Sequence, residues 1–345
     1  MSGLFSELDV AGRRLTNRIV LPPMATERAE ESGSPSTATV DWYADIAKAG
    51  MALVVVEHSF VTPEGRLSSR QLSVASDDVI RGHHAVADAI HAAGCLCAAQ
   101  INHAGANRRP DMPGRTVGPS PHPYPGAAAV PEQLTATEIA GIVRAFGSAA
   151  RRVRESGYDF VEVHCAHGYL LSQFLSPLTN HRSDAYGGTP ARRRRFLLEV
   201  VEEVTAAVAG SLPVMVRLGI SDNPPAAVLY EGGLTLAEGI QAARALDEAG
   251  VAILDLSAGI CGSRPAGIAG EAYYRAFAEA VRPAVRCRIV CTAGITMPAI
   301  ADDIVRTGTA DLVGIGRALA ADHAWIRRAR AELGDASGVR TADEH

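Results

Sequence analysis

Two histidines and a tyrosine stand close together after one of the predicted strands. His164, His167 and Tyr169 fall within six residues, directly after an apolar run at residues 160–163. Imidazole N–H groups can hydrogen-bond a substrate oxygen that gains negative charge, and a tyrosine hydroxyl can protonate a neighbouring carbon. The cluster predicts a site that polarises an oxygen and delivers a proton. Two alternatives stay open: satisfied core histidines, or a zinc site, although this His-x-x-His pair lacks a third ligand on the same element.

Glycines and an arginine follow the last two apolar runs in a pattern typical of a phosphate site. Gly294 and Gly316 let the backbone come close to an anion, and Arg317 can add a charge-assisted hydrogen bond. Many β/α barrels bind phosphate between the loops after their seventh and eighth strands. The alternative is that these glycines only end strands.

Two polar residues interrupt otherwise apolar runs in the middle of the chain. Gln100 can both donate and accept a hydrogen bond, which suits an imide edge such as that of a flavin. Arg217 is the only charge of its run, where it can stabilise an anionic ring or form a core ion pair with a carboxylate. His58 and His103 also follow strands, and each is either a cofactor contact or a structural histidine.

The elements that carry these residues repeat along the chain as an amphipathic helix, a turn and a short buried strand. Such continuous apolar runs, alternating with helices, predict a parallel sheet buried on both faces. Helices are expected at residues 39–49, 78–93, 135–156, 190–208, 235–249, 271–282, 298–307 and 318–333. Strands are expected at residues 18–22, 51–57, 95–101, 159–164, 212–218, 251–257, 288–294 and 310–316.

Eight such units predict a TIM (β/α)8 barrel of the α/β class. An open doubly wound sheet is the alternative, but no G-x-G-x-x-G follows an early strand. We expect a single barrel domain over residues 1–336 and a polar tail over 337–345. Two inserts, at 105–131 and 172–188, fall on the carboxyl side of strands, where barrel enzymes keep their chemistry.

Composition excludes several classes of protein. The 345 residues carry a net charge of −5, and no basic excess indicates nucleic acid or an anionic membrane. No signal-like or membrane-spanning apolar stretch is present, so we expect a cytoplasmic protein. The six cysteines form no C-x-x-C pair and no disulfide framework; they are Cys95, Cys97, Cys165, Cys261, Cys287 and Cys291.

Seven sequence blocks, in order, resemble the old yellow enzyme family of flavin-dependent ene-reductases. The longest is HCAHGYLLSQFLSPLTNHRSDAYGGTPARRRRF, which contains the histidine and tyrosine cluster. The others are LTNRIVLPPMAT, VVEHSFVTPEGR, AAQINHAG, VMVRLG, GGLTLAEG and ADLVGIGRAL. The resemblance covers residues 15–319.

The resemblance implies non-covalent FMN, reduced by NADH or NADPH, and a small-molecule substrate with an electron-poor alkene. His164 and His167 would hold the substrate oxygen, and Tyr169 would protonate the α-carbon after hydride transfer to the β-carbon. The resemblance leaves the oligomeric state open, and a homo-oligomer is possible within it. The residues expected to bind the cofactor are Pro23, Met24, Ala25, His58, Gln100, Arg217, Gly259, Ala293, Gly294, Gly316 and Arg317.

The chain departs from the family pattern at two positions. Ala25 stands where some members carry Cys or Thr near the flavin, and only a shifted loop would let Thr26 compensate. Ala106 stands where an arginine often follows the third strand. We expect an oxidoreductase acting on a CH–CH bond or on NAD(P)H. The alternatives are a barrel flavoenzyme that works as a dehydrogenase or demethylase, and a flavin-binding subunit without turnover.

Overall fold

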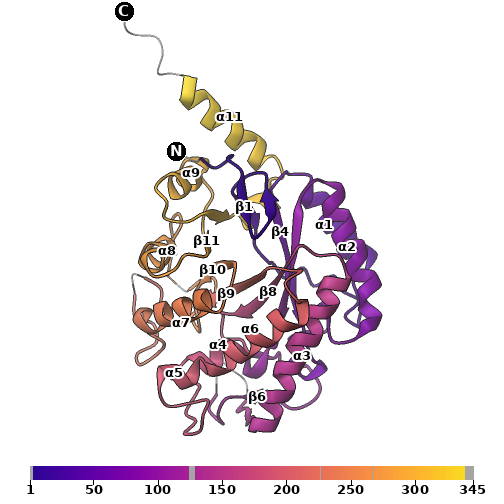
Figure 1. The fold of residues 1–345 in the computed structure, drawn as a ribbon, viewed down its shortest axis with the longest axis vertical. Helices are drawn as coiled ribbons and strands as arrows, with labels where there is room; N and C mark the ends of the chain where they lie inside the picture. Colours follow the sequence, from indigo (N-terminus) through magenta and orange to yellow (C-terminus); the bar gives the residue numbers. More distant parts are fainter. Residues whose placement is uncertain (1–2, 124–128, 226, 266, 339–345) are drawn as a thin grey trace, which may run out of the picture.

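Eight parallel strands close into a barrel in a computed structural model that describes residues 3–123, 129–225, 227–265 and 267–338 (Figure 1). The hydrogen-bonded order is β10-β11-β12-β3-β4-β5-β8-β9, closing on itself, so the predicted TIM barrel is confirmed. The strands are β3 (Ile19–Leu21), β4 (Leu53–Phe60), β5 (Leu96–Asn102), β8 (Phe160–Cys165), β9 (Val214–Gly219), β10 (Ile253–Ser257), β11 (Arg288–Thr292) and β12 (Leu312–Gly314).

Helices surround the barrel and cover the outward side chains of its strands. Capping boxes at Thr135 and Thr235 start two of them, because each threonine and the glutamate three residues later satisfy backbone N–H groups reciprocally. The helices are α1 (Thr37–Ala47), α2 (Ile80–Ala92), α3 (Ala136–Glu155), α4 (Leu170–Leu175), α5 (Pro190–Arg193), α6 (Arg195–Val208), α7 (Leu236–Glu248), α8 (Arg275–Val281), α9 (Pro298–Arg306), α10 (Arg317–Ala321) and α11 (Trp325–Gly338), with 3-10 turns η1 (Pro63–Gly65), η2 (Asp77–Val79), η3 (Gly105–Asn107) and η4 (Arg282–Ala284).

Two helices predicted as continuous are each divided. The segment 190–208 breaks into α5 and α6 at Arg194, and 318–333 breaks into α10 and α11. At the second break Asp322 is extended, and its carboxylate accepts the N–H of Ala324, so a side chain competes with the helical bond. Helix α11 runs through Gly338, and the rest of the expected tail, 339–345, lies outside the described residues.

A hairpin that the sequence pattern did not predict closes the amino-terminal end of the barrel. Strands β1 (Leu8–Val10) and β2 (Arg13–Leu15) pair antiparallel. At three residues each, they are too short for a periodic signal. Their apolar side chains, Leu8, Val10 and Leu15, pack with the inward residues of the barrel strands, including Leu53, Phe160, Met215, Ile253 and Leu312.

Both expected inserts lie beyond the carboxyl ends of strands, but neither is wholly irregular. In the first, β6 (Val117–Gly118) pairs with β7 (Glu132–Gln133), and residues 124–128 lie outside the described residues. The second begins within helix α4, which was expected to be irregular chain. All residues of α4 are buried, so packing rather than an amphipathic pattern holds this helix in place. No helix in the described part of the chain is long and apolar enough to cross a membrane.

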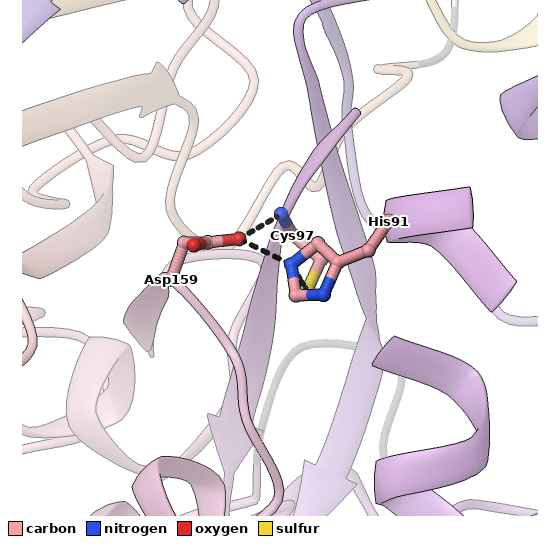
Figure 2. Close-up of side chains that lie close together, drawn as sticks. All are labelled: His91, Cys97 and Asp159. Carbon is pink, nitrogen blue, oxygen red and sulfur yellow. Dashed lines mark hydrogen bonds and ion pairs between the residues drawn. The ribbon is translucent and has the colours of Figure 1, made fainter. Parts of the chain in front are cut away.

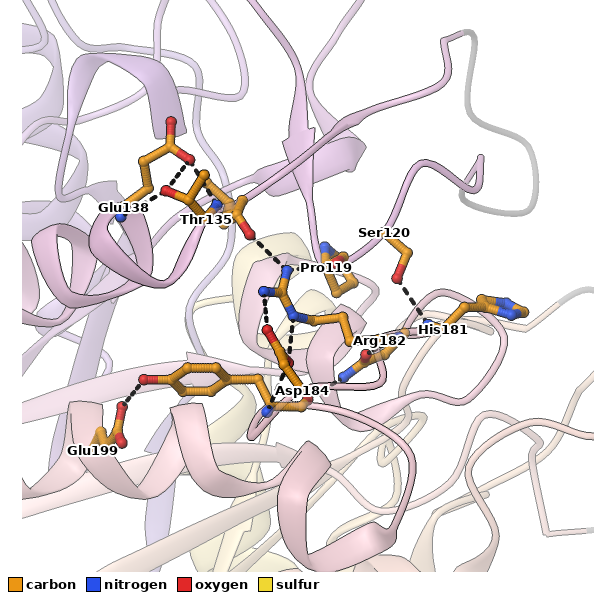
Figure 3. A network of polar contacts seen from close by, with 11 residues as sticks. Pro119, Ser120, Thr135, Glu138, His181, Arg182, Asp184 and Glu199 are labelled. Carbon is orange, nitrogen blue, oxygen red and sulfur yellow. Dashed lines mark hydrogen bonds and ion pairs between the residues drawn. The ribbon is translucent and has the colours of Figure 1, made fainter.

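Arg182 joins the two inserts (Figure 3). Its buried guanidinium donates to the backbone carbonyls of Pro119 (2.9 Å) and Leu134 (2.6 Å). It also forms a bidentate pair with Asp184, at 3.0 and 2.5 Å. Because one fork of donors serves three chain segments, this residue holds the loops that surround α4 in register.

We expect Arg182→Met to lower the free energy of unfolding by about 2–4 kcal/mol, because two buried carbonyls lose the charged donor that satisfies them. Urea unfolding followed by far-UV circular dichroism measures this. Arg306→Met is the matched control, since Arg306 is exposed and forms an ion pair with Asp302 one turn away. Equal stability of the Arg182 and Arg306 variants would contradict the role given to Arg182.

Candidate active site

A cavity of about 1020 Å³ opens at the carboxyl ends of the barrel strands. The cavity brings together residues from segments far apart in sequence. The carboxyl ends of the strands are where β/α barrels place their chemistry. Of the residues singled out from the sequence, those lining it are Pro23, Met24, Ala25, His58, Gln100, His164, His167, Tyr169, Arg217, Ala293, Gly294, Gly316 and Arg317.

Two residues singled out from the sequence do not line the cavity. Gly259 instead packs on Asp222, where a Cβ at residue 259 would lie 2.2 Å from the carboxylate oxygen Oδ1. His103 lies behind the site, and its Nδ1 accepts the N–H of Gly105. Close packing thus accounts for the glycine, and His103 has the structural role that the sequence left as one alternative.

His164, His167 and Tyr169 converge at one end of the cavity. The ring centroid of His164 lies 5.0 Å from that of His167 and 4.8 Å from that of Tyr169. His167 and Gly168 both have positive φ, 57° and 70°, so the chain turns sharply from β8 into α4, with Tyr169 at the N-cap. A left-handed histidine is an uncommon conformation of the kind that functional sites retain.

Hydrogen bonds orient the two imidazoles. Nδ1 of His164 accepts the N–H of Ala166 at 3.2 Å, so the proton of the neutral ring belongs on Nε2. Nε2 of His167 lies 2.7 Å from the hydroxyl of Ser257, and its backbone N–H donates to Ala258. Each ring therefore keeps one nitrogen without a partner in the described part of the chain. Both rings can address a ligand in the cavity.

Burial keeps all three side chains in their neutral forms. Desolvation is the main cause that holds the pKa of His164 and of His167 well below the usual value, and Arg217 adds to it in both. Burial also raises the pKa of Tyr169 to about 12. Near neutral pH the site thus presents uncharged imidazoles and a protonated phenol.

His58 reaches the same cavity because strand β4 contains a bulge. The pairing of β4 with β5 runs Val56 to Ala99 and then Ser59 to Ile101, so β4 holds one extra residue. His58 lies 5.4 Å from Tyr169, ring centroid to ring centroid. Its Nδ1 is 2.6 Å from the amide nitrogen of Gln71, which orients the ring.

A layer of buried polar side chains lies at the inner wall of the cavity, and Gln100 and Arg217 are its lining members. Nε of Arg217 lies 3.2 Å from Oδ2 of Asp255, and the amide of Gln100 donates to Glu162 at 2.7 Å. Burial, with the charge of Asp255, raises the pKa of Glu162 to about 8. The two carboxylates were not singled out from the sequence, although each is an acidic residue within an apolar strand.

Two polar atoms of this layer lack hydrogen bonds within the described residues. They are Nε of Arg217, whose ion pair lacks hydrogen-bond geometry, and Oε1 of Glu162. Buried polar groups in proteins are nearly always satisfied. A ligand edge that both donates and accepts would fit against Gln100 and Arg217, as the imide edge of FMN does.

The other end of the cavity is lined by backbone from the last two strands. Gly294 has φ of 72°, and a Cβ there would lie 2.5 Å from the ring of Tyr273. Ala293 has φ of 90°, and Arg317 lies 3.5 Å from the hydroxyl of Tyr273. Close backbone and an exposed arginine fit a phosphate group here. The residues of the inner wall and those at this end of the cavity thus fit FMN.

Ala25 receives no compensation from its neighbour. The hydroxyl and the N–H of Thr26 both donate to the carboxylate of Glu57, at 2.5 and 2.8 Å. Burial is the main cause that raises the pKa of Glu57 to about 7. Since Thr26 is not a lining residue, the cavity wall beside Met24 stays apolar.

An ion pair near Tyr169 was not found from the sequence. Arg109, in the first insert, contacts the carboxylate of Glu27 at 2.8 Å. Arg109 lowers the pKa of Tyr169 and Glu27 raises it, although burial outweighs both. Exposed loop residues give no periodic signal, so only the folded chain reveals this proximity.

We expect Glu162→Gln to make the stability of the flavin-free protein less dependent on pH. Glu162 has a pKa of about 8 when folded, against the ordinary 4.5 of an exposed glutamate. The folded state therefore binds the proton more tightly, and stability is lost as pH rises from about 5 to about 8. Melting temperatures across that range test this against the exposed control Glu248→Gln. Parallel curves for all three proteins would contradict it.

Comparisons with known proteins agree with this architecture. Residues 3–336 match the model of the NADH:flavin oxidoreductase / NADH oxidase family. The chain is 37% identical to an NADH oxidase of Thermoanaerobacter brockii over 95% of its length, but spans only about half (50%) of that protein. It is 35% identical to an NADPH dehydrogenase of Geobacillus thermodenitrificans, covering 96% of this chain and 94% of the relative.

Among solved structures, morphinone reductase in complex with tetrahydroNAD superposes with a TM-score of 0.81 at 28% identity. The match covers 96% of this chain and 91% of that one. The family uses FMN with NADH or NADPH. The chain therefore belongs to the NADH:flavin oxidoreductase / NADH oxidase family, the old yellow enzyme family that its sequence blocks resemble.

Proposed function

We propose that this NAD(P)H:flavin oxidoreductase reduces the C=C bond of an electron-poor alkene such as an α,β-unsaturated carbonyl compound. The observation that carries the proposal is the convergence of two neutral imidazoles and a protonated tyrosine on one cavity. This reduction needs N–H groups that donate hydrogen bonds to the substrate oxygen, and a proton donor beside them. Relatives that are an NADH oxidase, an NADPH dehydrogenase and a morphinone reductase support nicotinamide-dependent reduction.

His164 and His167 would hold the carbonyl or nitro oxygen of the substrate. Their ring centroids stand 5.0 Å apart and nearly perpendicular, so two N–H groups can meet one oxygen from different directions. Neutral imidazoles are donors without adding fixed charge, and their stabilisation grows as charge builds on the oxygen. This interaction withdraws electrons from the alkene and makes its β-carbon electrophilic.

Tyr169 would supply the proton to the α-carbon. With its pKa near 12, the hydroxyl keeps its proton across the physiological range. When bound, FMN would supply the hydride-transfer chemistry, with NADH or NADPH as the source of reducing equivalents. Gln100 and Arg217 would hold the pyrimidine edge, and Ala293, Gly294, Gly316 and Arg317 the phosphate. Pro23, Met24 and Ala25 would line the ring, with His58 as a further contact.

Replacing Tyr169 with Phe should slow reoxidation of the reduced enzyme by 2-cyclohexenone about 10²–10⁴-fold, the usual contribution of a general acid. Reduction by NADPH should be unchanged, because that half-reaction needs no proton from Tyr169. Anaerobic stopped-flow absorbance measures both half-reactions separately. Tyr186→Phe, at a tyrosine that hydrogen-bonds Glu199 outside the cavity, is the control. Normal reoxidation of the Tyr169 variant would assign the proton donor elsewhere.

Replacing Arg317 with Ala should weaken FMN binding about tenfold to a hundredfold, the worth of a charged hydrogen bond. Riboflavin has the same ring system without the phosphate, so its binding should not change. Fluorescence titrations of the flavin-free protein with both ligands measure this difference. Equal weakening of FMN and riboflavin would contradict a phosphate contact and indicate a general effect on the fold.

A further inference from the structure

Three potential metal ligands gather at the amino-terminal end of the barrel, away from the active site (Figure 2). His91 lies in the last turn of α2, Cys97 is the second residue of β5, and Asp159 directly precedes β8. The side chain of Cys97 belongs to the layer between strands and helices, whereas Gln100 of the same strand lines the cavity. The proposed reaction makes no use of this group.

The three side chains already lie near the spacing that a tetrahedral cation requires. Zinc bonds of about 2.0–2.3 Å put neighbouring ligand atoms roughly 3.3–3.8 Å apart. Sγ of Cys97 is 3.4 Å from Nε2 of His91, which in turn is 2.7 Å from Oδ2 of Asp159. All the ligand atoms lie within 4.8 Å of one another. Binding would need the His91–Asp159 contact to open by about 1 Å, and the Cys97 sulfur and the Asp159 carboxylate, which lie within 4.8 Å of each other, to come within roughly 3.8 Å.

Backbone contacts hold two of the three ligands in place. The N–H of Asp159 donates to the carbonyl of Cys97 at 2.8 Å, and the N–H of Cys97 donates to Oδ2 of Asp159 at 2.9 Å. His91 is the ligand whose side chain can move, since that side chain is 36% exposed and the residue lies in the last turn of α2. The same exposure provides an entry path for a cation.

Charge also favours a cation at this position. The carboxyl-terminal end of helix α2 carries partial negative charge, and Asp159 adds a carboxylate. With a thiolate and a neutral imidazole, the three ligands would neutralise a divalent ion. Thiolate and imidazole together select zinc-like cations over magnesium or calcium.

We propose that His91, Cys97 and Asp159 bind a thiophilic divalent cation of the zinc class, with water as the fourth ligand. The cation would replace the side-chain contacts of His91 with Asp159 and Cys97, and would tie α2 to β5 and β8. Because a thiol coordinates a metal ion as its thiolate, binding would release the proton of Cys97 to the buffer. His91 would coordinate through Nε2 and carry its proton on Nδ1.

The test is a zinc titration of the tag-free, chelator-treated FMN holoenzyme against a competing chromophoric chelator. We expect one zinc ion per chain and a higher melting temperature with zinc. His91→Ala should weaken binding at least about tenfold, since even losing a partner outside the coordination shell costs a metal site that much. Cys97→Ala should do the same. The exposed His91 variant keeps the test valid if the buried cysteine variant fails to fold.

His84→Ala is the matched control. His84 lies on the same helix, and its Nε2 is 3.4 Å from Oδ2 of Asp88, but this pair includes no cysteine. That variant should bind zinc as the parent does. The proposal fails if the parent binds no zinc, or if His84→Ala weakens binding as much as His91→Ala. It also fails if His164→Ala abolishes binding while His91→Ala does not, since zinc would then occupy the active site.

Discussion

Closure of the barrel is the constraint on which the rest of the structure depends. Eight parallel strands that form a closed ring satisfy every strand edge, and their carboxyl ends then meet around one axis. Side chains alternate between the interior and the helix layer, so every second residue of a regular strand points inward, and only the bulge in β4 interrupts this pattern among the registers described. Residues from β5, β8, β9 and β10 reach the same depth without any sequence proximity.

Successive inward residues of these strands form two layers inside the barrel, an apolar one and a polar one. Ala98, Phe160, Met215 and Ile253 fill the interior beside the N-terminal hairpin. Two residues further along the same strands stand Gln100, Glu162, Arg217 and Asp255. The apolar layer excludes water from below, so the polar layer is desolvated. This explains why Glu162 binds its proton tightly and why the nearby imidazoles stay neutral.

The two ends of the barrel have different roles. At the carboxyl end, glycines, a left-handed histidine and buried charges are tolerated because they build a cavity. At the amino-terminal end, a hairpin closes the interior, and short contacts among His91, Cys97 and Asp159 join a helix to two strands. The first arrangement fits the ligand binding that we propose, and the second fits a stabilising role, consistent with what barrel proteins usually place at each face.

By itself the sequence determined the fold class, the family and the main cluster of side chains suited to chemistry. The alternation of helices and apolar strands is a local signal, and His164, His167 and Tyr169 are neighbours in the chain, so both can be recognised without coordinates. Gly294 and Gly316, which we propose face the phosphate, could be placed together because barrel geometry assigns the ends of the last two strands to one location.

Only the tertiary structure decided which isolated residues join the site. A one-residue bulge in β4 accompanies the arrival of His58 in the cavity, while His103 packs behind it; no sequence period reports a bulge. Gly259 is explained by the buried Asp222 against which it packs, and the ion pair of Arg109 with Glu27 joins two separate loops. These facts depend on contacts between distant segments, and such contacts exist only once the barrel has closed.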